Sequence, residues 1–111
     1  MNIGLFHAFF VIFVYCPNLP SDVCFLIGKV YNDIGLLYNG LKSYENAAEC
    51  FELAIPLMRT ENPDKNLEAV LQQNLGAVYN QRKQFNKAVE CHRQAISLHG
   101  TKDILYDKGY F

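Results

Sequence analysis

The chain has 111 residues, of which 50% are hydrophobic and 19% charged, and its formal net charge is -1. That length allows one thin domain, and the near-zero charge argues against a protein that binds nucleic acid or a membrane surface through bulk charge. A disordered chain is excluded as well, because the aromatic content of 14% and the many aliphatic residues can fill a core.

Residues 1–21 form an apolar N-terminal segment. Nearly every side chain from Ile3 to Cys16 is apolar, and the first formally charged residue is Asp22. The segment is short for a membrane span, which needs about 20 residues, and it lacks the basic start and clear cleavage site of a secretory signal. Three interpretations stay open: a capping helix that packs on the first hairpin, a signal or membrane anchor through residues 3–16, and a non-native start. We favour the capping helix.

Residues 22–61 are the first of two repeat units. Sliding the sequence on itself by 41 residues aligns residues 34–39 with residues 75–80, and the register continues without a gap to Leu57 and Leu98. At the same offset the apolar N-terminal segment agrees poorly with the second helix of the unit. Two amphipathic helices are predicted here, with apolar stripes at helical spacing: Ile34, Leu37, Tyr38 and Leu41, then Tyr44, Ala47, Ala48, Phe51, Ala54 and Ile55.

Local signals set the ends of these helices. Gly40 lies where the first helix must end, and Ser43 is a plausible N-cap for the second. Pro56 falls inside the second helix, so it predicts a bend or an irregular last turn. Gly35 lies in mid-helix, where its cost of about 0.5–1 kcal/mol is tolerated if a neighbouring helix must approach closely.

Residues 62–100 are the second unit. Asn62 and Pro63 predict an N-cap followed by proline at the first helical position, and Gly100 closes the unit. Gly76 repeats the mid-helix glycine of the first unit. The two predicted stripes are Leu67, Val70, Leu71, Leu75, Val78 and Tyr79, then Phe85, Ala88, Val89, Ala95, Ile96 and Leu98.

Residues 101–111 resemble the cap and first turn of a further helix, truncated at the end of the chain. Repeat proteins usually need at least three units, so two units with fragments predict marginal independent stability.

The four cysteines follow no metal or redox spacing. Cys50 and Cys91 occupy equivalent places in the two units, and packed helices hold equivalent positions roughly 10 Å apart. A disulfide needs Cα atoms within about 7 Å, so this pair is predicted to be unbridged. Together with the lack of an Asn-x-Ser/Thr acceptor, this favours a reducing, cytoplasmic setting.

The order of residues in each unit resembles the tetratricopeptide repeat. The first unit carries that pattern at Tyr31, Ile34, Gly35, Tyr38, Tyr44, Ala47, Phe51 and Ala54, and the second at Leu75, Gly76, Tyr79, Phe85, Ala88 and Ala95. Gln72 and His92 depart from it at two aromatic positions. The family's usual period is 34 residues, and the longer period here is similar to the branch found in kinesin light chains and Leu-Gly-Asn-repeat regulators. The resemblance implies an all-α fold of antiparallel helical hairpins, stacked as a short right-handed superhelix.

The resemblance also implies a concave groove lined by the first helix of each unit. The groove-facing positions carried over are Lys29, Asn32, Asp33, Leu36 and Asn39, then Val70, Gln73, Asn74, Ala77, Asn80 and Gln81. Their amides can donate to and accept from the backbone of a bound peptide, which suits binding that does not depend on peptide charge. Alternatively, these are merely solvated helix faces. The chaperone-binding members use a clamp of Lys and Asn, which only Asn74 matches, so a chaperone tail is disfavoured.

We therefore expect a non-enzymatic scaffold that binds a protein or peptide partner, with no cofactor, metal or nucleic acid. The histidines are scattered and lack the cysteine or carboxylate neighbours that a metal site or a nucleophile–base pair requires. We interpret His92 as a core or interface residue. Two alternatives remain: self-association through the apolar N-terminus, and membrane tethering by residues 3–16.

Overall fold

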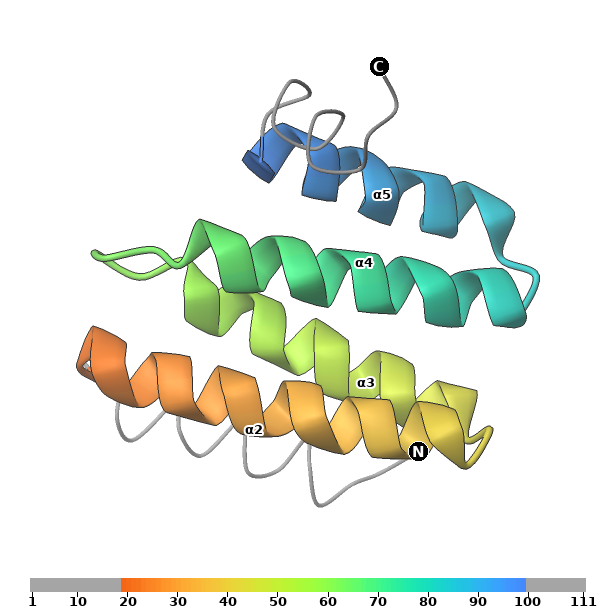
Figure 1. Cartoon of the computed structure of the whole chain (residues 1–111), viewed down its shortest axis with the longest axis horizontal. Coiled ribbons are helices and arrows are strands. Elements are labelled where there is room, and N and C mark those ends of the chain that lie inside the picture. The colour runs from red at the N-terminus through yellow and green to blue at the C-terminus, as the bar shows by residue number, and fades with distance from the viewer. Residues whose placement is uncertain (1–18, 100–111) are drawn as a thin grey trace, which may run out of the picture.

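The computed structural model describes residues 19–99, which form two antiparallel helical hairpins (Figure 1). The first hairpin consists of α2 (Ser21–Gly40), α3 (Tyr44–Ala54) and the short 3-10 helix η1 (Ile55–Met58). The second consists of α4 (Lys65–Gln81) and α5 (Phe85–His99). These residues contain no strand, so the predicted all-α fold of repeated hairpins is confirmed. The predictions for the apolar N-terminal segment, for Gly100 and for a further helix at 101–111 lie outside the described residues, apart from the few at 19–21.

The two helices of each hairpin approach most closely at the mid-helix glycine of the first helix. A Cβ atom placed on Gly35 would lie 2.6 Å from Cε1 of Phe51, and one on Gly76 would lie 2.8 Å from Cε1 of His92. The predicted close approach of the two helices is confirmed in both hairpins. Phe51 and His92 are equivalent at the 41-residue offset, yet Phe51 is fully buried and His92 is exposed. The difference arises because α4 packs on the first hairpin, whereas no described helix packs on the far side of α5.

Both first helices end in the same motif. α2 ends at Gly40 as predicted, but the left-handed residue is Lys42, with a φ of 61°, and its equivalent Lys83 has a φ of 62°. The Ser43 N–H donates to the Tyr38 carbonyl over 2.9 Å, which closes the six-residue hydrogen-bonded turn that usually places glycine at this position. A lysine here carries the steric cost of the left-handed conformation.

The N-caps differ in part from the prediction. Asp64, and not Asn62, caps α4: its side chain accepts a hydrogen bond of 2.8 Å from the Leu67 N–H. Ser43 occupies the N-cap position of α3 as predicted, but its hydroxyl oxygen accepts from the Asn46 side chain instead of the backbone. An Asn-Pro pair and an aspartate one residue later are both good caps, so the sequence pattern alone selected the wrong one.

Pro56 explains why α3 is shorter than α5. α3 ends at Ala54, and the chain continues as η1 with Pro56 in its first turn. Proline lacks the N–H that the α-helical ladder needs, so the last turn tightens into a 3-10 helix. The predicted irregular last turn is confirmed.

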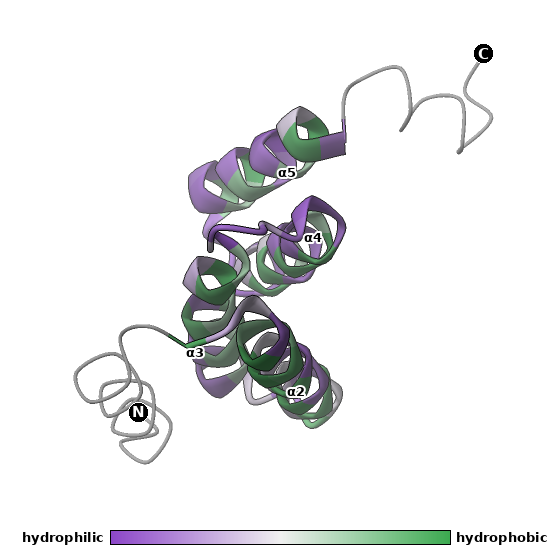
Figure 2. Cartoon of the chain, turned by 90° about the vertical axis from the view of Figure 1, so that its left-hand side faces the viewer, coloured by the Kyte–Doolittle hydropathy of each residue, from purple (hydrophilic) through white to green (hydrophobic). Residues whose placement is uncertain are grey.

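The core lies between α2, α3 and α4. Its fully buried large side chains are Phe51, Met58, Leu71 and Val78, with Cys50 beside them. Burial of this kind supplies most of the stability of a small helical domain, at roughly 25 cal/mol for each Å² of apolar surface removed from water. Figure 2 shows the hydropathy of the four long helices and the stacking of the second hairpin on the first.

Several residues of the predicted apolar stripes are exposed. Leu37 is 69% exposed and Leu41 77% exposed on α2, although both were expected to face the core. The same correction applies to Val70, Phe85, Val89 and Ile96. Helical spacing identifies the apolar side of a helix, but it does not say whether a neighbouring element is there to cover it. These side chains lie where no described element packs.

Candidate functional site

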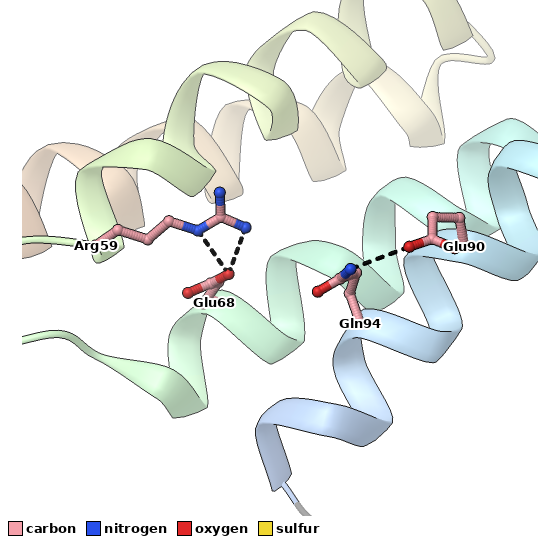
Figure 3. A network of polar contacts seen from close by, with 4 residues as sticks. All are labelled: Arg59, Glu68, Glu90 and Gln94. Atoms are coloured by element: carbon pink, nitrogen blue, oxygen red, sulfur yellow. Dashed lines mark hydrogen bonds and ion pairs between the residues drawn. The ribbon is translucent and has the colours of Figure 1, made fainter.

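Polar side-chain contacts join the two hairpins. The Asn74 side-chain NH2 donates to Oδ1 of Asn32 over 2.8 Å, and the Tyr79 hydroxyl donates to the Glu52 carboxylate. Arg59 and Glu68 form an ion pair in which one guanidinium nitrogen lies 2.8 Å from Oε2 (Figure 3).

These contacts are partly shielded from water: Glu68 is 5% exposed, whereas the Arg59 side chain is 54% exposed. Polar groups buried without such partners would each cost about 1–3 kcal/mol. The contacts therefore fix how α4 lies against the first hairpin, and with it the position of α4 relative to α2.

Most of the predicted site residues share one exposed face of α2 and α4, which we call the α2–α4 face. Lys29, Asp33 and Leu36 are exposed on α2, and Ala77, Asn80 and Gln81 are exposed on α4. Asn39, Gln73 and Asn74 are half-buried. Val70 is 39% exposed on the same side of α4. The face combines amides, one cation, one carboxylate and a few aliphatic side chains.

Asn32 differs from the other predicted site residues because it is buried. It is only 9% exposed, and its Oδ1 is occupied by Asn74. The pair bridges the two helices at the centre of the α2–α4 face and holds them in register. Asn32 and Asn74 are therefore structural residues of the face, and the freely exposed amides are those of Asn80 and Gln81.

A hollow of about 510 Å³ lies at one end of the two helices, where α2 and α4 begin. Its lining includes Phe25 and Asn66, which were not among the predicted site residues. Phe25 lies one turn before Lys29, Asn66 lies one turn before Val70, and the two are equivalent at the 41-residue offset. The register that revealed the repeat could thus have extended the predicted face by one turn. The other lining residues are Ser21, Asp22, Asn62, Pro63, Asp64 and Lys65.

Cys50, Cys91 and Tyr79 are unsuited to acid–base or nucleophilic chemistry at neutral pH, because burial keeps them protonated. Burial, with a contribution from Glu49, raises the pKa of the Cys50 thiol to about 11. Burial also raises the pKa of Cys91 and, together with the hydrogen bond to Glu52, that of Tyr79. A protonated thiol is a poor nucleophile and a poor metal ligand. Cys24, Cys50 and Cys91 are all unbridged, as predicted for the Cys50–Cys91 pair.

No group of three or more His, Cys, Asp and Glu side chains within residues 19–99 is arranged to hold a metal ion. Among the same residues, no helix is both long and apolar enough to cross a membrane. His92 is exposed, and its ring lies against Gly76 of the neighbouring helix. It therefore packs between helices without belonging to a buried core.

Two stacked hairpins with glycine at each crossing define an all-α helical-repeat protein. The family model described as Tetratricopeptide repeat matches residues 26–99, about two-thirds of the chain. The chain belongs to the tetratricopeptide repeat family. No curated protein and no solved structure matched it significantly. Proteins of this family generally serve as protein-interaction scaffolds and are generally not enzymes.

Proposed function

We propose that the chain holds a peptide segment of a partner protein against the α2–α4 face. The observation that carries the proposal is the group of amides on this face beside the Asn32–Asn74 bridge, with half-buried Asn39 and Gln73 and exposed Asn80 and Gln81. An exposed amide offers a donor and an acceptor at once, so it can pair with both groups of a peptide backbone. Because Lys29 and Asp33 carry opposite charges, the face selects for backbone and shape more than for peptide charge.

The hollow at the start of the helices supports an anchor point for such a peptide. Phe25 supplies an aromatic surface, and Asn66 supplies another amide at the same level. The hollow is open to solvent, so it can receive one side chain of the peptide without enclosing it. The proposed peptide therefore runs along the α2–α4 face and places one side chain in the hollow.

The test is a double substitution on the face, Asn39→Ala with Asn80→Ala. Neither residue takes part in the Asn32–Asn74 bridge, and alanine raises helix propensity, so we expect the circular dichroism to stay unchanged. Loss of two amide contacts should weaken partner capture by about tenfold or more.

The matched control is Asn86→Ala with Gln94→Ala, which removes two exposed amides from α5, one of them hydrogen-bonded to Glu90 of the same helix. It should leave partner capture unchanged. Retained binding in the Asn39→Ala/Asn80→Ala variant would refute the proposal, as would equal losses in both variants.

Self-association is the second candidate function, because α5 presents three exposed apolar side chains at helical spacing. Phe85 is 57%, Val89 54% and Ile96 42% exposed. Contiguous exposed apolar surface commonly marks a contact with another chain. Sedimentation analysis tests self-association: a monomer at high concentration would rule it out, and a dimer abolished by Val89→Lys would support it.

We also propose the long-period branch of the family, on the strength of the 41-residue offset that spans both hairpins. Extending the alignment of the chain to more repeats of its own gene product would test this. A cytoplasmic location stays a prediction, and fractionation of cells that express the tagged chain would check it.

A further inference from the structure

α2 carries an exposed apolar stripe along its whole length. Its members are Val23, Leu26, Val30, Leu37 and Leu41, which are between 37% and 77% exposed. Gly28 and Gly35 face η1 and α3, since added Cβ atoms would meet Met58 and Phe51. Leu37 lies two residues beyond Gly35, about 200° around the helix. The stripe therefore faces away from the first hairpin's own second helix.

The equivalent stripe on α4, in the second hairpin, is covered by a neighbouring helix. Leu71 and Val78 of α4 are equivalent to Val30 and Leu37 at the 41-residue offset. Both are fully buried, whereas Val30 is 55% and Leu37 69% exposed. Gly76 faces α5. Val78 lies two residues further, about 200° around the helix, so it faces the first hairpin. The equivalent stripe on α4 is thus buried by the second helix of the preceding hairpin.

The repeat register identifies the segment that would occupy this place on α2. α3 with η1 spans Tyr44–Met58, and subtracting 41 gives residues 3–17. The apolar segment Ile3–Cys16 coincides with that range and joins α2 directly through residues 17–20. Because four residues join the segment to α2, the contact would form within one chain and would not depend on protein concentration.

Two of the four positions that would face α2 carry aliphatic side chains. In the first hairpin, Glu52 of α3 and Arg59, which follows η1, both contact α4. Ala48 and Ile55 lie on the same side at helical spacing, so these four positions form the stripe that faces α4. The equivalents in the N-terminal segment are His7, Val11, Val14 and Asn18.

The N-terminal segment and α3 differ most at positions that do not face the following helix. Ala47 and Ala54 align with Phe6 and Phe13. Ala54 lies beside Gly28, on the side of α3 that meets its own first helix, and Ala47 shares that side seven residues earlier. The mismatch therefore does not bear on the contact with the following helix.

We propose that residues 3–16 of this chain pack along the Val23–Leu41 stripe of α2, as the second helix of an incomplete preceding repeat. The proposal gives the apolar segment a role inside the fold and covers the largest exposed aliphatic side chains of α2. It is independent of the peptide-binding role of the α2–α4 face, because Val30 and Leu37 at the centre of the stripe lie about 100° around α2 from Lys29 and Leu36 on that face.

The experiment measures nuclear Overhauser contacts in the full chain. Methyl contacts are expected from Val11 and Val14 to Val30 and Leu37, and none to Leu36, which lies on the α2–α4 face. A sample that mixes two differently labelled populations separates contacts within a chain from contacts between chains. Contacts within one chain support the proposal. Contacts only between chains, or no contacts from residues 3–16 to α2, would overturn it.

A pair of matched variants provides a second readout. Leu37→Asp should raise amide exchange across residues 3–16 by about tenfold or more, because the segment loses a large aliphatic contact. Leu36→Asp, one residue away on the other face, should leave that exchange unchanged. Equal effects of the two substitutions, or no effect of either, would contradict the proposed packing.

Discussion

Alanine substitutions at three helical glycines test the proposed helix packing with one chemical change. At Gly40 an added Cβ meets nothing within 4 Å, so Gly40→Ala should stabilise the fold by up to about 0.5–1 kcal/mol through helix propensity. At Gly35 the same Cβ would lie 2.6 Å from Cε1 of Phe51, whose ring is fully buried. Overpacking of this kind typically costs about 1–3 kcal/mol.

Because the propensity gain is shared, the difference between Gly35→Ala and Gly40→Ala should equal the overpacking cost. Urea unfolding followed by circular dichroism at 222 nm measures it, and a difference of about 1 kcal/mol corresponds to several degrees in melting temperature. Gly76→Ala should fall between the two, since the exposed His92 ring can turn away but the Cβ of Cys91, 3.2 Å from the added Cβ, cannot. A Gly35→Ala protein as stable as Gly40→Ala would refute the close contact of α2 with α3.

Three further predictions concern the helix ends and the core. Lys42→Gly should raise the free energy of unfolding by about 1 kcal/mol, because it removes a side chain from a left-handed position; an unchanged urea midpoint would contradict this. Asp64→Ala should cost about 1 kcal/mol and Asn62→Ala very little, and thermal melts that reversed this order would reject Asp64 as the cap. Since the pKa of Cys50 is raised in the fold to about 11, its contribution to stability is full below the unfolded pKa near 8.5 and is lost as the pH rises toward 11. Urea midpoints at pH 8 and pH 10.5 should therefore differ less in a Cys50→Ala variant than in the unmodified chain.

The sequence predicts the hairpins well because their determinants are local and repeated. Gly35 and Gly76 at one offset require two close helix crossings, and Pro56 requires a break in the α-helical ladder. The exposure of Leu37 and Val89 was not predictable in the same way, because it depends on which helix packs on which side. Spacing within one helix contains no information about that neighbour.

In the candidate site too, some features follow from the sequence and others depend on three-dimensional packing. The positions on the α2–α4 face follow from the repeat register, and the extension to Phe25 and Asn66 follows from it too. The hydrogen bond between Asn32 and Asn74 does not, since these residues are 42 apart and are therefore not equivalent at the 41-residue offset. It depends on how the two hairpins are rotated against each other, and only the three-dimensional packing determines that.

The most direct test of the peptide-binding role is to map a bound peptide on the side-chain amides. Peptides selected from a random library by the full chain would be titrated into the isotope-labelled protein. Peptide binding at the α2–α4 face should shift the amide resonances of Asn39, Gln73 and Asn80, and leave those of Asn86 and Gln94 on α5 unchanged. Shifts confined to α5, or a library that yields no binding peptide, would contradict the proposed function.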